Sequence, residues 1–569
     1  MLADRYLNKT EFDSYEDFKK NYKINVPDNF NFGFDIVDVY ADENPGKTAL
    51  VWCNDYDEEK IITFAQMKKH SNKIANFLIK LGIKKGDAVM LMLKQHYEYW
   101  FAAVALHKIG AVLVPGSFQL TQKDIAYRNN AANIKMIIAV GEPYVVEQIE
   151  AAMPESPSVI AKAIVKANGI AQTKRDGWID FAGEYEKESD IFERSDNSDV
   201  TAGDVMLTYF TSGTTGMPKM VAHDHSYPLG HITTAKYWQQ VQDNTLHLTD
   251  NDSGWAKFGW GKIYGQWIAG AAIMAYDKDK FVPENLLKVI EKYKVTTFCG
   301  APTIYRFFIQ EDLSKYDFSN LKHAATAGEP LNPEVFNKFL EATGLKIYEG
   351  FGQSESSVLL ANFGWFEPRP GSTGKPAPLY DMDLADENGK SCADGDEGEI
   401  IIKLTDNNYP AGLMTGYLQE DGKLDKSCFD GGVYHTGDTA WRDTNGYYWF
   451  VGRKDDMIKC SGYRIGPFEV ESAVLEHPAV LECAITGAPD PVRGQVVKAT
   501  IVLIKDAKEK GYEPNGDLIK EIQDHVKKTT APYKYPRVIE FVEELPKTIG
   551  GAKIKRAEIR KESEDKFNK

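Results

Sequence analysis

Cysteine pairs, long apolar runs and an excess of positive charge are all missing from this chain. Its six cysteines, at positions 53, 299, 392, 428, 460 and 483, form no Cys-x-x-Cys motif, which disfavours a zinc ribbon and indicates reduced thiols rather than a disulfide framework. No apolar run reaches the ~20 residues needed to span a bilayer, and the N-terminus lacks the apolar segment of a secretory signal. We therefore expect a cytoplasmic protein with no membrane span.

The charge balance is acidic. The 67 lysines and arginines are outnumbered by 83 aspartates and glutamates, which gives a net charge of −16. A chain without an overall basic field cannot displace the counterions of a nucleic acid, so we expect no nucleic acid partner. The chain has no internal repeat, and its 569 residues are too many for one hydrophobic core, which predicts two or more domains.

Strand and helix patterns alternate through the first part of the chain. Strands are predicted at 49–52, 88–93, 136–140 and 205–210, and amphipathic helices at 64–81 and 97–109. Residues 1–45 are polar and aromatic, and we expect them to form a surface lead-in. Alternating strands and helices predict an α/β fold, here a large layered domain of mixed and parallel sheets with helices.

A break near 452–455 separates a second pattern. Strands are predicted at 481–485, 499–504 and 537–542, with a helix at 517–528. This pattern indicates a small, mobile α+β domain. We place the boundary after residue 454, so that the domains cover 1–454 and 455–569. The Lys and Arg residues near the C-terminus would mostly be solvated, although single members could contact a phosphate-rich ligand.

Residues 211–219 read Thr-Ser-Gly-Thr-Thr-Gly-Met-Pro-Lys and follow the predicted strand 205–210. Glycines let the backbone approach a ligand, and hydroxyls and a lysine donate to anionic oxygens, so the loop suits a polyphosphate. It is not a Walker A loop, because no Gly-Lys-Ser/Thr closes it. A flexible surface linker is the alternative. The candidate phosphate-binding residues are Thr211, Ser212, Gly213, Thr214, Thr215, Gly216 and Lys219.

Two later stretches place carboxylates where a nucleotide site needs them. Residues 348–355 read Tyr-Glu-Gly-Phe-Gly-Gln-Ser-Glu, and a carboxylate beside a phosphate loop is best explained by Mg²⁺. Residues 434–438 read Tyr-His-Thr-Gly-Asp. We expect a turn that sets Asp438 at a strand end, where it could accept hydrogen bonds from a ribose, although Asp in a Gly-Asp turn is more often structural.

Together these motifs resemble the adenylate-forming superfamily of acyl-CoA synthetases, luciferases and peptide-synthetase adenylation domains. The resemblance covers nearly the whole chain. It implies that Ser354 contacts the α-phosphate, that Glu355 binds Mg²⁺, and that Asp438 and Arg453 hold the AMP ribose. Residues 298–305 match a stretch that lines the acyl pocket in the superfamily. The remaining ATP contacts that the resemblance implies are Glu349, Gly350, Phe351, Gly352 and Gln353.

The resemblance also implies a hinge and a catalytic lysine. Asp455, in the Gly-Arg-Lys-Asp run, occupies the hinge position, although a charged turn is the simpler reading. Residues 545–556 resemble Pro-Lys-Thr-x-x-Gly-Lys-Ile-x-Arg, which assigns catalysis to Lys553 together with Ser354 and Glu355. This chain has one extra residue before that lysine, and Ala552 replaces a glycine. Lys547 and Lys555 are therefore lesser candidates.

Three segments, at 461–467, 489–494 and 531–537, are most similar to the medium-chain acyl-CoA synthetases. In that subfamily they meet coenzyme A. The implied CoA contacts are Ser461, Gly462, Tyr463, Arg464, Arg493, Lys527, Tyr535 and Arg537.

Substrate length is argued at Gly352. Acetyl-specific relatives carry a tryptophan there, and without that indole the pocket would gain room for several methylenes, each worth about 0.8 kcal/mol when buried. Trp255, Phe258 and Trp260 are plausible walls. Lys257 and Lys262 would either tether a polar group of the acid or point outward. We expect C4 to C8, branched or aromatic acids.

The predicted function is an ATP-, Mg²⁺- and CoA-dependent ligase that makes acyl-AMP and then acyl-CoA. Alternatives are a short-chain acetyl or propionyl enzyme, an adenylation enzyme that loads a carrier protein, and a non-catalytic nucleotide sensor. A homodimer is left open. His223 and His225, one residue apart, and His435 are read as structural rather than metal-binding.

Overall fold

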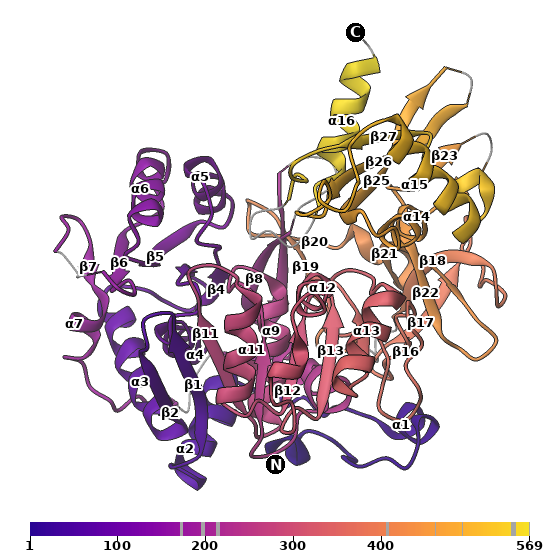
Figure 1. Cartoon of the computed structure of the whole chain (residues 1–569). Helices are drawn as coiled ribbons and strands as arrows, with labels where there is room; N and C mark the ends of the chain where they lie inside the picture. Colours follow the sequence, from indigo (N-terminus) through magenta and orange to yellow (C-terminus); the bar gives the residue numbers. More distant parts are fainter. Residues whose placement is uncertain are drawn as a thin grey trace.

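The computed structural model describes residues 1–170, 174–194, 200–211, 217–404, 409–460, 463–491, 493–547 and 554–567. Two nine-stranded sheets with flanking helices make up most of the molecule, and two smaller sheets are formed by strands of the C-terminal third of the chain (Figure 1). The predicted α/β class is confirmed. All six cysteines are free thiols. No helix among the described residues is long and apolar enough to cross a membrane.

One large sheet has the strand order β16-β15-β14-β13-β12-β10-β11-β1-β2. Its six central strands, from β14 to β1, run parallel to one another, whereas β15 and β2 pair antiparallel at their two ends. Their carboxyl ends therefore share one edge, which is where open α/β sheets bind ligands. The strands are β1 (Thr48–Asn54), β2 (Glu59–Thr63), β10 (Leu246–Thr249), β11 (Ala272–Asp277), β12 (Thr297–Gly300), β13 (His323–Ala327), β14 (Ile347–Phe351), β15 (Leu360–Ala361) and β16 (Lys375–Pro376).

The other large sheet has the order β20-β19-β9-β8-β4-β3-β5-β6-β7. Strands β3 to β7 and β8 are parallel, whereas β9 and β19 run antiparallel to their neighbours. The strands are β3 (Ala88–Met92), β4 (Val112–Pro115), β5 (Ile134–Val140), β6 (Ala161–Val165), β7 (Ile179–Asp180), β8 (Val205–Thr211), β9 (Lys219–Asp224), β19 (Gly416–Leu418) and β20 (Leu424–Asp425).

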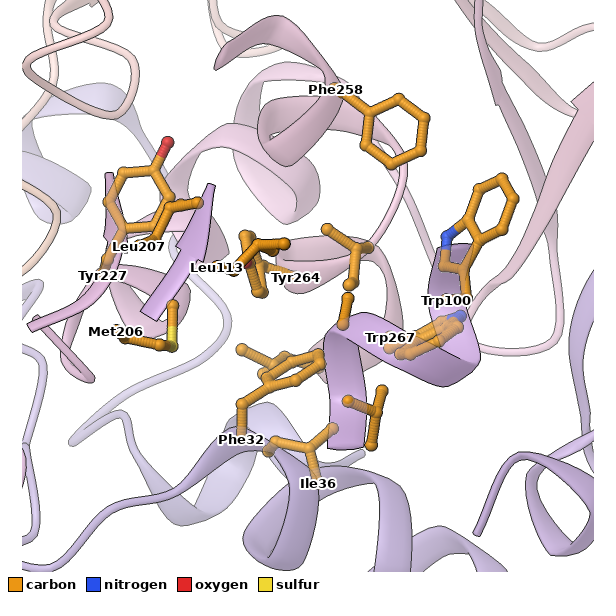
Figure 2. Packing of buried hydrophobic residues seen from close by; sticks show 14 of the residues in the cluster. Phe32, Ile36, Trp100, Leu113, Met206, Leu207, Tyr227, Phe258, Tyr264 and Trp267 are labelled. Carbon is orange, nitrogen blue, oxygen red and sulfur yellow. The ribbon is translucent and has the colours of Figure 1, made fainter. Parts of the chain in front are cut away.

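The largest hydrophobic core joins these layers. Helix α4 (Glu98–Ile109) is buried at every position and ends at Gly110, which adopts a left-handed φ of 71°. Helix α3 (Phe64–Lys80) begins with a capping box in which Thr63 and Gln66 satisfy each other's backbone. Figure 2 shows Trp100 of α4 beside Trp267 in this core. Both helices and the strand 205–210 were predicted within one or two residues.

The N-terminal segment differs from the prediction. We expected residues 1–45 to be a surface lead-in, but the side chains of Phe18, Phe30 and Phe32 are fully buried. Phe32 packs parallel to Trp267 with 6.0 Å between the ring centres. Aromatic side chains bury large areas, so this segment is part of the core.

Two smaller sheets complete the chain. One is the antiparallel β17-β18-β21-β22, with β17 (Asp381–Ala385), β18 (Glu397–Lys403), β21 (Val433–Arg442) and β22 (Tyr448–Arg453). The last contains β23 (Ile458–Cys460), β24 (Tyr463–Ile465), β25 (Val480–Asp490), β26 (Gly494–Leu503) and β27 (Val538–Phe541). It lies with helices α14 (Pro467–Leu475), α15 (Gly516–Thr529) and α16 (Arg556–Phe567) in the orange to yellow part of Figure 1. The four predicted C-terminal elements are present.

Candidate active site

The candidate nucleotide residues gather where strands of both large sheets end. Strand β8 ends at Thr211 and β14 ends at Phe351. The loop after β14 is tied to the other sheet, because Nε2 of His223 on β9 lies 2.7 Å from the carbonyl oxygen of Ser354. Of the predicted phosphate loop, Ser212, Gly213, Thr214, Thr215 and Gly216 lie outside the described residues.

His223 contacts the backbone carbonyl of Ser354. Burial lowers the pKa of His223 to about 4, so its imidazole is neutral and Nε2–H donates to the carbonyl. His225 is also fully buried. Among the described residues no cluster of three or more His, Cys, Asp or Glu side chains could hold a metal. His435 is partly exposed and lies 3.3 Å from Glu399.

Lys219 and Glu355 both contact Tyr417. The ammonium of Lys219 lies 4.7 Å from the centre of the Tyr417 ring, and the phenol donates a 2.9 Å hydrogen bond to Glu355. Burial and the Glu355 carboxylate raise the pKa of Tyr417 far above its usual value, so the phenol keeps its proton. Glu355 is half-buried, and no ion pair holds it within the part of the chain that the structure describes.

Asp438, Arg453 and Gln353 form the second half of the site. Asp438 and Arg453 are paired across β21 and β22, and Nε of Arg453 lies 3.8 Å from Asp438 and 3.5 Å from Asp455. The Gln353 amide donates to Asp438 and, at 2.8 Å, to the carbonyl of Thr436. The predicted turn at 434–438 was wrong, because these residues lie inside β21 rather than at a strand end.

Glu349 and Gly350 face the protein interior. The Glu349 carboxylate is 3% exposed, and its described donor is the Leu331 backbone N–H at 3.4 Å. Burial raises the pKa of Glu349 to about 8. A Cβ on Gly350 would lie 2.5 Å from the Trp238 ring, so this glycine is required by packing.

Gly328 is a candidate that the sequence reasoning missed. It follows β13, which ends at Ala327 in the same row of strand ends as Phe351. Its φ of 107° is accessible mainly to glycine, and a Cβ there would meet nothing within 4 Å. Positive φ with open space at a strand end indicates a backbone reserved for close approach of a ligand. The Ala-Gly-Glu-Pro sequence at 327–330 was the available signal.

The structure places the acyl-pocket candidates in different surroundings. A Cβ on Gly352 would lie 2.4 Å from the indole of Trp260 and 2.8 Å from the carbonyl oxygen of Ser357, so the indole fills part of the space that the glycine leaves. Phe258 lies in the core beside Trp100 (Figure 2), with 5.3 Å between ring centres. Trp255 caps helix α9 (Ala256–Gly261) and is partly exposed.

Both lysines of that segment point inward. The ammonium of Lys257 donates to the carbonyl of Ala327 at 2.9 Å. Lys262 is fully buried and donates to Gln95, and burial lowers its pKa to about 7. The outward-pointing alternative is therefore wrong for both side chains. The stretch 298–305 contains the end of β12 and the start of helix α12 (Pro302–Phe308).

Three of the CoA candidates, Lys527, Tyr535 and Arg537, lie in contact with one another. The Arg537 guanidinium donates to the Tyr535 hydroxyl at 2.6 Å, and Lys527 lies 4.5 Å from the same ring centre. Tyr463 is 52% exposed and stacks on Tyr533. Arg464 lies in β24, Arg493 follows β25, and Ser461 and Gly462 lie outside the described residues.

The structure describes the surroundings of the lysine candidates and of the hinge candidate to different extents. Lys553 itself is outside the described residues, but its neighbour Ile554 lines a cavity that Gly328 and Glu329 also line. Lys547 pairs with Glu482 at 2.9 Å, and Lys555 is partly exposed near Glu558. Asp455 lies in the turn after β22. The domain boundary after residue 454 stays a prediction.

Comparison with known proteins agrees with this geometry. Residues 37–418 match the family described as AMP-binding enzyme, and residues 469–552 match its C-terminal domain. The chain is 42% identical over 564 residues to the mitochondrial acyl-coenzyme A synthetase ACSM3 of Mus musculus, covering 98% of this chain and 94% of that protein. It is 41% identical over 544 residues to the mitochondrial ACSM4 of Homo sapiens, covering 94% of this chain and 91% of that protein.

The anthranilate CoA ligase AuaEII, solved with anthranoyl-AMP, superposes with a TM-score of 0.84 at 29% identity, covering 96% of this chain and 99% of the other. An acyl-CoA synthetase of Brucella canis superposes with a TM-score of 0.72 at 30% identity, covering 98% of this chain and 100% of the other. The motifs, the strand-end site and these relatives agree, and the chain belongs to the AMP-binding enzyme family, among its acyl-CoA synthetases.

Proposed function

We propose that this protein is an ATP-dependent acid–thiol ligase. It activates a medium-chain, branched or aromatic carboxylic acid as acyl-AMP with release of pyrophosphate, and then transfers the acyl group to CoA with release of AMP. The observation that supports this best is the Gln353–Glu355 loop. One end of this loop contacts Asp438 through Gln353, and the other contacts Tyr417 through Glu355, while Lys219 lies over the ring of the same tyrosine.

The residues present fit a magnesium ion. Mg²⁺ prefers one or two carboxylates together with phosphate oxygens, and Glu355 is a half-buried carboxylate held in place by Tyr417. Glu355 would hold the ion next to Lys219. When bound, Mg²⁺ supplies positive charge that offsets the phosphate oxygens.

In the first step a carboxylate oxygen of the acid attacks the α-phosphorus of ATP and pyrophosphate leaves. Lys219 lies at the end of the phosphate loop, Ser354 offers a hydroxyl to the α-phosphate, and Lys553 adds positive charge to the transition state. Asp438 and Arg453 hold the ribose. Catalysis consists of positioning and electrostatic stabilisation, because charge spreads over the phosphoryl oxygens.

In the second step the CoA thiol attacks the acyl carbonyl and AMP leaves. Lys553, which acts in the first step, and the CoA residues, which act in the second, belong to the same small domain, 455–569. A single orientation of that domain could hardly place both at the active site. We infer that this domain rotates about Asp455 between them, relative to the large domain 1–454. The cluster of Lys527, Tyr535 and Arg537 suits the phosphates of CoA.

The acid is proposed from the pocket and from the relatives. The named activity of AuaEII is on anthranilate, an aromatic acid. Gly352 lacks the indole that acetyl-specific relatives carry at this position, whereas the indole of Trp260 lies beside Gly352. This arrangement favours compact branched or aromatic acids over long chains. Lys257 would face the acid's polar groups. The two curated relatives are mitochondrial by name, and the cytoplasmic location expected from the sequence stays a prediction, as does the possible homodimer.

Pyrophosphate release tests the proposal. Purified protein with Mg·ATP is given acids from acetate to octanoate, branched acids and benzoates, each with and without CoA. We expect CoA-dependent turnover that is highest at C4 or longer, or on branched or aromatic acids. Highest turnover on acetate would contradict the pocket argument. Release that is independent of CoA would favour loading of a carrier protein, and ATP binding without release would favour a nucleotide sensor.

A further inference from the structure

The small domain presents a buried ion pair to the large domain. Arg556 Nη2 lies 2.8 Å from both carboxylate oxygens of Glu471, and both side chains are less than one tenth exposed. Glu471 also accepts the Ile485 backbone N–H at 2.8 Å. The Arg556 guanidinium lies 4.4 Å from the centre of the Phe468 ring. These contacts fix the start of α16 to α14, because a bidentate pair sets both distance and orientation.

The large domain faces it with a second ion pair and a polar side chain. Arg306 on α12 donates to Thr303 at 2.7 Å and to Glu329 at 3.4 Å. Asn332 caps helix α13 (Pro333–Thr343) by accepting the Glu334 N–H at 2.7 Å. The other end of the same side chain, Nδ2, crosses the junction and donates to the carbonyl of Ser472 at 3.4 Å.

Between the two faces lies a cavity of about 90 Å³, which is large enough to hold water. Arg306, Glu329 and Asn332 line it from the large domain, and Glu471, Ser472 and Arg556 line it from the small one. Each face carries one cation and one anion. Each of these surfaces is stable both against the other domain and in water. When the two faces separate, each charged side chain keeps its oppositely charged partner on its own face, so no charge is left unpaired.

The orientation in this structure favours the nucleotide site. Ile554, next to the candidate lysine in sequence, lines the same cavity as Gly328, which follows β13. Of the CoA candidates, in contrast, Tyr463 is 52% exposed and Arg537 is exposed as well. The contact therefore brings Ile554 and Arg556 to the cavity beside Gly328 and leaves Tyr463 and Arg537 exposed.

We propose that this contact is a latch that stabilises the small domain in the orientation for acyl-AMP formation and opens for thioester formation. Asn332 is the positioning residue that crosses the junction. The Arg306–Glu329 pair lies on the same side of the cavity as Asn332, opposite Glu471 and Arg556. The proposal rests on the two-step function proposed above. It predicts that weakening the latch affects the two half-reactions differently, which a loss of folding would not do.

The first test substitutes Asn332→Ser, which keeps a helix-capping oxygen but is too short to reach Ser472. ATP–pyrophosphate exchange reports acyl-AMP formation, and CoA transfer from chemically synthesised acyl-AMP reports the second step. We expect exchange to fall about fivefold, the scale of one net hydrogen bond, while CoA transfer is unchanged or faster. The matched control is Asn515→Ser at the cap of α15, where Asn515 accepts the Asp517 N–H at 3.0 Å. It should change neither half-reaction.

The second test closes the latch covalently. The double variant Asn332→Cys/Ser472→Cys is joined with a short bis-maleimide, and wild type treated with the same reagent is the control. Cross-linked protein should keep acyl-AMP formation and lose CoA transfer at least tenfold. Retention of both half-reactions, or loss of both, would overturn the latch, as would equal loss in Asn332→Ser. If the wild-type protein shows no ATP–pyrophosphate exchange with any acid, the proposed function itself is wrong. The wild-type measurement therefore separates failure of the proposed function from failure of the latch.

Discussion

The phenol oxygen of Tyr417 lies 2.9 Å from Oε1 of Glu355 and donates a hydrogen bond to it. The same ring has the ammonium of Lys219 4.7 Å from its centre. One tyrosine on β19 thus connects the end of the phosphate loop to the candidate magnesium ligand. Nothing in the local sequence around residue 417 announces this role.

Removing that hydroxyl should disturb magnesium use. In Tyr417→Phe the carboxylate loses a donor, and a hydrogen bond to a charged group is worth about 1.5–3 kcal/mol. We expect pyrophosphate release to fall about tenfold and the half-saturating Mg²⁺ concentration to change. The control is Tyr447→Phe, whose hydroxyl donates to the Glu367 carbonyl at 2.9 Å away from the site. A Mg²⁺ titration identical to wild type would contradict this role.

The Trp260 indole should set the usable chain length. Trp260→Ala removes the ring that lies against Gly352, and each further methylene buried adds about 0.8 kcal/mol, or about fourfold in kcat/KM. The optimum among straight-chain acids should move to longer chains. Trp441→Ala is the control, because Trp441 stacks on Trp449 at 5.4 Å outside the pocket. An unchanged optimum would exclude Trp260 as a wall.

Asp438 should control ATP affinity. In Asp438→Asn one acceptor for ribose hydroxyls is lost, and the Arg453 guanidinium loses one of its two carboxylate partners. We expect the KM for ATP to rise at least tenfold, while the KM for the acid changes little. Asp383→Asn, at a carboxylate paired with Lys403 at 2.7 Å, is the matched control. Equal increases in both KM values would indicate a general structural defect instead.

Glu349 should make stability depend on pH. Its folded pKa, about 8, is raised above the ordinary value by burial. The native state therefore binds more protons than the unfolded state between the two values, and stability falls as pH rises through that window. Relative to Glu349→Gln, the wild-type free energy of unfolding should fall by up to about 1.4 kcal/mol per pH unit between about pH 5 and 8. Denaturant unfolding of both proteins measures this, and parallel pH profiles would refute it.

Fixing the turn at Asp455 should separate the two steps. Proline fixes φ, so Asp455→Pro should spare pyrophosphate exchange and impair CoA transfer if the small domain rotates there. Asp455→Ala leaves the backbone free to change and should keep both half-reactions. Equal loss of both half-reactions in the proline variant would count against rotation about this residue.

Much of the fold was predictable from local pattern. Helix α3 carries its own start signal in Thr63 and Gln66, and α4 ends at a glycine with positive φ, so their limits are encoded locally. The depth of burial was not predictable. The segment around Phe18 and Phe32 looked superficial because of its polar neighbours, yet it packs into the core. The strand containing Asp438 was predicted as a turn from the local preference of Gly-Asp. In the structure, pairing of β21 with β18 and β22 outweighs that preference.

The sequence by itself determined the family, the nucleotide motifs and the α/β class, because short-range spacing and periodicity encode them. Only the tertiary structure decided that Trp260 fills the space beside Gly352 and that Lys257 and Lys262 point inward. The contacts of Tyr417 with Glu355 and of Asn332 with Ser472 were likewise decided there. The physical reason is that these contacts join segments far apart in the chain, and their geometry exists only once the sheets and the small domain have packed together.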